Sequence, residues 1–213
     1  MNEAPEFDAR FRAGLLDLFV WRRDVRHFRA DEIPQAVLER LLRVASLAPS
    51  VGLSQPWRFV AVDDPARRLA VRACFEACNA EALQAQSEGR AGLYARLKLA
   101  GLDDAPHHIA VFADRGTLQG NGLGRRTMPE MAEYSAVIAI HTLWLAARAE
   151  GIGLGWVSIL DPSSMAGILD VPEGWRFVGY LCLGYPRMQT ETPELEACDW
   201  ERRNPQAGTL VQR

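Results

Sequence analysis

Several features are scarce or missing in this 213-residue sequence, and their absence excludes whole classes of protein. Lys and Arg number 24 and Asp and Glu 27, so no basic excess favours nucleic acid or an anionic membrane as partner. No apolar run reaches the ~18 residues of a membrane span. The acidic residues 1–6 lack the basic and apolar regions of a signal peptide. We therefore expect a cytoplasmic protein that binds neither nucleic acid nor a membrane.

Cysteine is also scarce, and its spacing gives little support for a metal site. The four cysteines are Cys74, Cys78, Cys182 and Cys198, and no pair forms a C-x-x-C motif. His107 and His108 are adjacent at the start of a predicted strand, where neighbouring side chains point to opposite faces. We expect no bound metal and reduced, packing cysteines.

Three familiar active-site motifs are missing as well. The glycines of residues 151–155 do not have the G-x-G-x-x-G spacing, and they follow a predicted helix rather than a strand. No G-x-x-x-x-G-K-[ST] sequence occurs, which excludes a P-loop. Ser158 is not surrounded by G-x-S-x-G, so a hydrolase nucleophile is disfavoured.

What the sequence does contain is a series of helical and strand patterns. They predict one α+β domain over residues 1–213, with a mixed central sheet surrounded by helices. A polar C-terminal arm, about residues 185–213, has little core of its own and suits wrapping around a partner subunit. The expected helices cover residues 11–19, 34–48, 64–88, 91–100, 131–150 and 163–169, and the expected strands cover residues 58–62, 108–113, 155–159 and 176–183.

Two of these helices carry apolar stripes that we expect to be buried. The first stripe consists of Phe11, Leu15, Leu18 and Phe19, and the second consists of Met131, Tyr134, Ile138, His141 and Leu145. The second is the most regular in the chain, which predicts a central buried helix with His141 as a core histidine. The long glycine-rich stretch at residues 114–129 suggests a mobile loop or lid.

The densest local charge follows the first helix. Arg22, Arg23, Arg26 and Arg29 fall within eight residues, with Asp24 among them. One interpretation is a solvated basic helix end, because helix C-termini favour arginine. The other is a clamp for an anionic ligand, because guanidinium groups match phosphate oxygens bidentately.

Residues 48–59 form the second informative stretch. Pro49 and Pro56 stiffen this connection between a helix and a strand, which also contains Ser50, Ser54 and Gln55. It can be interpreted as a well-made turn. Alternatively, its hydroxyls and amide hydrogen-bond the edge of a planar heterocycle or a polyol.

Together, the two stretches resemble the FMN-binding signature of the nitroreductase-like flavoproteins. The sequence R-R-x-x-R-x-F at residues 22–28 is followed by A-P-S-x-x-x-S-Q-P-W-x-F, and residues 183–186 resemble the family's late Gly-Tyr-Pro segment. The resemblance extends over almost the whole chain. Asp24 stands where most members have serine, and Leu53 where most have asparagine. These departures, with residues 155–159, resemble a branch of the family that consumes its flavin.

The resemblance implies an oxidoreductase that takes reduced FMN as substrate and O2 as co-substrate. Its products would be 5,6-dimethylbenzimidazole, the lower ligand of vitamin B12, and D-erythrose 4-phosphate. The implied flavin contacts are Arg22, Arg23, Asp24, Val25, Arg26, Ser50, Leu99 and Ser158. Asp24 and Ser158 are the implied catalytic residues, and Asp24 is the candidate acid and base.

The resemblance also implies partners and an alternative. Family members are homodimers with FMN at the subunit interface, and a separate flavin reductase would supply reduced FMN. We hypothesise that the loop at residues 114–129 covers the reacting flavin. The alternative function is an NAD(P)H-dependent FMN nitroreductase or another flavin oxidoreductase on the same fold.

Overall fold

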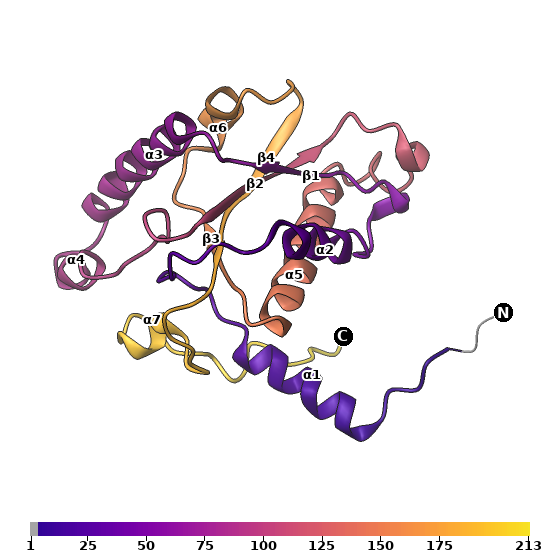
Figure 1. Ribbon diagram of the computed structural model, residues 1–213, viewed down its shortest axis with the longest axis horizontal. Helices are drawn as coiled ribbons and strands as arrows, with labels where there is room; N and C mark the ends of the chain where they lie inside the picture. The colour runs from indigo at the N-terminus through magenta and orange to yellow at the C-terminus, as the bar shows by residue number, and fades with distance from the viewer. Residues whose placement is uncertain (1–3) are drawn as a thin grey trace.

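The computed structural model describes residues 4–213 around a four-stranded sheet (Figure 1). The strands are β1 (Trp57–Ala61), β2 (His107–Asp114), β3 (Gly153–Val157) and β4 (Trp175–Gly184), in the order β1-β2-β4-β3. All three strand pairs are antiparallel, so the prediction of a mixed sheet is wrong for these strands. Within residues 4–213, parallel pairing occurs as one isolated bridge between Asp24 and Leu154.

Seven α-helices are present in the described part of the chain. They are α1 (Ala9–Trp21), α2 (Gln35–Ala45), α3 (Pro65–Gln84), α4 (Glu88–Tyr94), α5 (Met131–Ala149), α6 (Pro162–Leu169) and α7 (Glu194–Ala197). Asp8, Asp64 and Asp161 each cap a helix by accepting a backbone N–H bond from its first turn. The helix expected over residues 91–100 is displaced, because α4 starts at Glu88 and ends at Tyr94.

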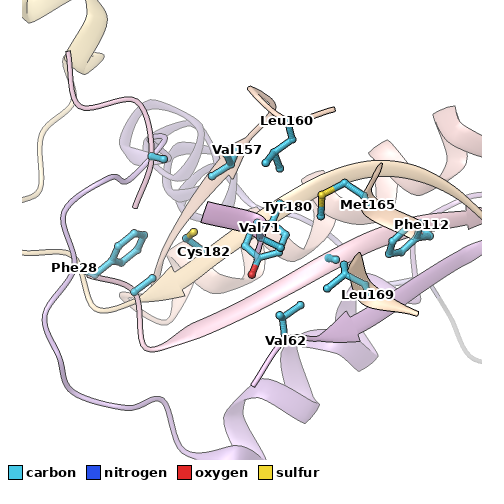
Figure 2. Packing of buried hydrophobic residues seen from close by; sticks show 13 residues of the cluster. Phe28, Val62, Val71, Phe112, Val157, Leu160, Met165, Leu169, Tyr180 and Cys182 are labelled. Atoms are coloured by element: carbon cyan, nitrogen blue, oxygen red, sulfur yellow. The ribbon is translucent and has the colours of Figure 1, made fainter. Parts of the chain in front are cut away.

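The sheet separates two hydrophobic cores, and alternate residues of each strand enter opposite cores. On β4, Tyr180 and Cys182 face the core under α3 and α6, whereas Leu181 and Leu183 face the core under α2 and α5. Figure 2 shows the first of these cores, with Phe28 at one end of it. The buried Phe28 anchors the segment that follows the arginine cluster to the edge of the sheet.

Helix α5 is central, as expected, but it buries a different face from the predicted one. Its buried residues are Ala132, Ser135, Ala136, Ala139, Ile140, Leu143 and Ala147. Tyr134 and Ile138 are exposed, and so is His141, which is therefore not a core histidine. The helix is apolar on most of its circumference, and its alanine face allows the closest approach to the sheet.

Helix α1 forms where expected, yet none of its residues is buried. The helix projects from the body of the molecule (Figure 1), and Phe11, Leu15 and Phe19 of the predicted buried stripe are exposed. The predicted burial of this stripe is therefore not found within one chain. An exposed apolar face of this extent is unfavourable in water unless another protein surface covers it.

The C-terminal segment is not an extended arm along its whole length. Its first part pairs with the arginine segment, through the Phe28–Pro186 bridge and a 3.0 Å bond from the Arg187 amide to the His27 carbonyl. Farther on, the Trp200 carbonyl accepts a 2.8 Å bond from Arg90, whose guanidinium lies 4.5 Å from the indole centroid. Residues 185–200 therefore fold back onto their own chain, and residues 201–213 are exposed.

Candidate functional site

The arginine segment leaves α1 and is placed against the start of β3 by its backbone. The Val25 amide donates to the Leu154 carbonyl at 3.1 Å, beside the Asp24–Leu154 bridge. A Cβ atom on Gly155 would lie 2.1 Å from the Val25 carbonyl oxygen, so only glycine permits this close approach. The two glycines before and after Leu154 therefore explain why the segment docks at this place.

The carboxylate of Asp24 is fixed by two donors. Its Oδ1 accepts from the Trp156 backbone N–H at 2.9 Å, and its Oδ2 accepts from Arg26 Nε at 3.0 Å. Arg26 is buried and also donates to the Lys98 carbonyl at 3.0 Å. The carboxylate thus has a single orientation among cations, and 35% of the Asp24 side chain remains accessible.

Arg22 and Arg23 are only partly satisfied by the protein. Burial lowers the pKa of both guanidinium groups, and repulsion from the nearby Arg203 lowers it further. Arginine nevertheless stays protonated at neutral pH. The buried Nε of Arg23 has no hydrogen-bond partner among the described residues. Positive groups held together with an unused donor fit a phosphate group.

A cavity of about 510 Å³ opens beside this segment. Its walls come from residues 23–27, residues 152–154 and residues 186–190, together with Trp21, Trp144, Arg148, Thr192, Glu194 and Ala197. Four of the predicted contact residues line it, namely Arg23, Asp24, Val25 and Arg26. The cluster therefore adjoins a cavity large enough for a ligand of nucleotide size.

Ser158 lies close to Asp24 along β3, but outside this cavity. It is the residue after the strand, is exposed, and follows Trp156 by two positions. Residues two apart in an extended chain are about 7 Å from each other, so Ser158 lies near the Trp156 amide that binds Asp24. The structure therefore places the two implied catalytic residues on neighbouring segments.

Leu99 is adjacent to the arginine cluster through its backbone neighbour, the carbonyl of Lys98 that Arg26 binds. The sequence predicts Leu99 near the end of a helix, but it lies in the loop after α4. There it lines a smaller cavity of about 200 Å³ that includes Arg72 and Phe75. Leu99 and Arg26 are thus brought together, whereas Arg22 and Leu99 both lie outside the larger cavity.

Ser50 is distant from the arginine segment within one chain. Its Oγ accepts from the Gln55 amide at 3.0 Å, and the next residue, Val51, binds Ser135 on α5. Trp144, which binds the arginine segment, lies nine residues farther along that helix. The helical rise of 1.5 Å per residue puts these two contacts about 13 Å apart.

The glycine-rich loop at residues 114–129 lies beside the loop of Ser50. Gln119 donates to the Leu53 carbonyl at 2.7 Å, and Gly52 and Gly120 approach so closely that neither has room for a side chain. None of residues 114–129 lines the large cavity. In a single chain the loop therefore covers the loop of Ser50 rather than the arginines.

Sequence reasoning missed several residues that complete the basic site. Arg148 on α5 and Arg187 in the C-terminal segment line the cavity, and Arg203 lies near Arg22 and Arg23. The adjacent arginines 202 and 203 in an otherwise acidic tail were the one available signal. No group of three metal-binding side chains occurs within residues 4–213. In the same range, no helix is both long and apolar enough to span a membrane.

Comparisons with known proteins show the family of this chain. The model of the Nitroreductase family matches residues 19–185. The 5,6-dimethylbenzimidazole synthase of Rhodospirillum rubrum is 58% identical over 96% of this chain and 97% of its own length. The enzyme of the same name from Rhodobacter capsulatus is 48% identical over 93% and 96%.

A solved structure supports the fold alone. It is an iodotyrosine deiodinase bound to FMN and 3-iodo-L-tyrosine, 24% identical, with a TM-score of 0.70 over 93% of this chain and 97% of that one. The match covers nearly the whole of both chains, which agrees with the predicted α+β, nitroreductase-like fold. By sequence and by fold, this chain belongs to the nitroreductase family and, within it, to the 5,6-dimethylbenzimidazole synthases.

Proposed function

We propose that this chain converts reduced FMN and O2 to 5,6-dimethylbenzimidazole and D-erythrose 4-phosphate. The relatives named for 5,6-dimethylbenzimidazole synthesis, 58% and 48% identical, support this activity. The structural observation that carries it is the Asp24 carboxylate, fixed by Trp156 and Arg26 inside a cluster of arginines. A carboxylate beside a bound phosphate is electrostatically costly, and the contacts of Asp24 with Arg26 and the Trp156 amide offset that cost.

The arginines bind the anionic end of the substrate. Arg22, Arg23 and Arg26 hold the FMN phosphate, and Asp24 and Val25 contact the flavin from the same segment. The unpaired Nε of Arg23 supports this role, since a phosphate oxygen would satisfy it. Ser50 and Leu99 contact the flavin from their loops.

Reduced flavin supplies electrons to O2, while the chain's own residues handle protons and exclude water. Asp24 is the acid and base at the hydroxyl-bearing carbons of the ribityl chain, because its carboxylate is oriented and partly accessible. Ser158, on the neighbouring stretch of β3, orients the ring or a water molecule through its hydroxyl. The chain carries no recognisable nicotinamide-binding motif, so a separate flavin reductase is the proposed source of reduced FMN.

A direct assay tests this function. The purified chain is incubated in air with FMN, NADH and a flavin reductase, and products are separated by liquid chromatography. We expect 5,6-dimethylbenzimidazole in air and none without O2. Reduction of a nitroaromatic by NADH, with no benzimidazole formed, would instead identify the alternative nitroreductase activity.

A second copy of the chain is the proposed partner, with FMN at the interface between the two. The loop of Ser50 and the arginine segment contact α5 nine residues apart, and Ser50 does not line the large cavity, so the partner's loop is the proposed contact. The apolar face of α1, including Leu16 at 64% exposure and Val20, and the exposed face of α5, including Ile138, are the surfaces to be covered.

Charged substitutions on α1 test the proposed dimer. The double variant Leu16→Asp/Val20→Asp puts two carboxylates on the face that the partner would bury, so we expect a monomer with weakened FMN binding. Light scattering after size exclusion measures the mass. Leu69→Asp on α3 is the control, because Leu69 is equally exposed but lies elsewhere. A double variant that remains dimeric would contradict this interface.

A further inference from the structure

Trp144 on α5 contacts two consecutive arginines through different parts of its side chain. The guanidinium carbon of Arg22 lies 4.7 Å from the centroid of the indole ring. The Nε1–H of the same indole donates to the Arg23 carbonyl at 3.1 Å. One side chain therefore fixes both the head group of Arg22 and the backbone of Arg23.

The indole is itself held against the site. Its ring lies 6.4 Å from that of Trp156, the residue whose amide binds Asp24, and Trp144 lines the large cavity. The arginine segment is thus attached to β3 by backbone bonds on one side and to α5 by Trp144 on the other. Without the indole, Arg22 would have many rotamers available, and ordering them on binding costs free energy.

We propose that Trp144 is a positioning residue that prepares Arg22 and Arg23 to receive the phosphate of FMN. The inference rests on the proposed function, because it assumes that these arginines bind that phosphate. A stack on tryptophan restricts the guanidinium plane without using its N–H groups. The five donors of Arg22 therefore stay free for an anion while the plane is fixed.

The selectivity for FMN over riboflavin distinguishes this role from a merely structural one. Riboflavin has the same ring and ribityl chain but lacks the phosphate. A tryptophan that only supports the fold would affect the binding of both flavins alike. A tryptophan that acts through the arginines affects FMN and leaves riboflavin unchanged.

The test uses Trp144→Phe in the full chain, with dissociation constants for oxidised FMN and riboflavin measured by flavin fluorescence. We expect FMN affinity to fall about tenfold, since a hydrogen bond and part of the stack are lost, while riboflavin affinity does not change. The matched control is Trp175→Phe, because Arg58 stacks at 5.8 Å on that indole and neither residue lines the large cavity. The control keeps both affinities.

A second variant keeps the inference testable if Trp144→Phe does not fold. Arg22→Lys keeps the charge but removes the planar group, and it is expected to lower FMN affinity without lowering riboflavin affinity. Because the two residues act as a unit, the double variant should lose less than the product of the single losses. An unchanged ratio of the two affinities in Trp144→Phe overturns this inference. Absence of any preference for FMN in the unsubstituted chain overturns the proposed function instead.

Discussion

Asp24→Asn is expected to bind FMN at least as well as the unsubstituted chain and to form 5,6-dimethylbenzimidazole at least about 100-fold more slowly. The amide oxygen of asparagine can still accept the 2.9 Å bond from the Trp156 N–H, and the Arg26 Nε that loses its acceptor becomes free to bind the phosphate. Removing a negative charge beside a phosphate also removes a repulsion, so binding is not expected to weaken. The loss therefore falls on the turnover number, because asparagine cannot take up or release a proton.

The chain contains a matched control for this substitution in the same segment. Asp31 accepts from Arg29 Nε at 2.8 Å, with the two-residue spacing of Asp24 and Arg26, but both side chains of this pair are 55% exposed. Asp31→Asn is expected to leave turnover unchanged, because exposed ion pairs contribute little. Stopped-flow or fixed-time assays with reduced FMN measure both variants. Full turnover by Asp24→Asn would move the acid and base role to another residue.

The sequence was sufficient for the elements that local pattern determines. The strands lie within two residues of their predicted starts, because short apolar runs between turn residues specify them locally. The arginine segment and its carboxylate were also identified, because no other part of the chain concentrates charge in this way. These features depend on residues that are neighbours in the sequence, so the predicted and observed positions agree closely.

The wrong or missing predictions concern features that depend on contacts between residues far apart in the sequence. Periodicity could not decide which face of α5 is buried, because most of that helix is apolar, and the alanine face containing Ala136 and Ala139 was favoured by close packing. The exposed Tyr134 and Ile138 belong to the face that this chain leaves uncovered. Likewise, the Trp200 carbonyl accepts a bond from Arg90 on α4, 110 positions away in the sequence. This contact holds the C-terminal segment against α4, and Arg203 lies near Arg22.

Gly155→Ala is expected to remove most of the activity without touching any catalytic side chain. The new Cβ atom would lie 2.1 Å from the Val25 carbonyl oxygen, a backbone atom that cannot move alone. The segment would therefore separate from β3, and the Val25–Leu154 and Asp24–Trp156 bonds would be lost. We expect FMN affinity to fall more than tenfold, turnover more than 100-fold, and the free energy of unfolding by about 1–3 kcal/mol.

Two further glycines separate this backbone clash from a general intolerance of alanine. Gly167→Ala on α6 meets nothing within 4 Å and is expected to leave activity unchanged and stability equal or up to about 1 kcal/mol higher. For Gly153→Ala the three nearest atoms all belong to the side chain of Val25, at 2.9 to 3.1 Å, so its milder defect should be reduced by adding Val25→Ala, which removes two of them. The same addition should not rescue Gly155→Ala, because the obstructing carbonyl remains. Chemical denaturation and flavin titration of these variants measure both effects, and rescue of Gly155→Ala by Val25→Ala would show that backbone docking at β3 is not what holds Asp24 in place.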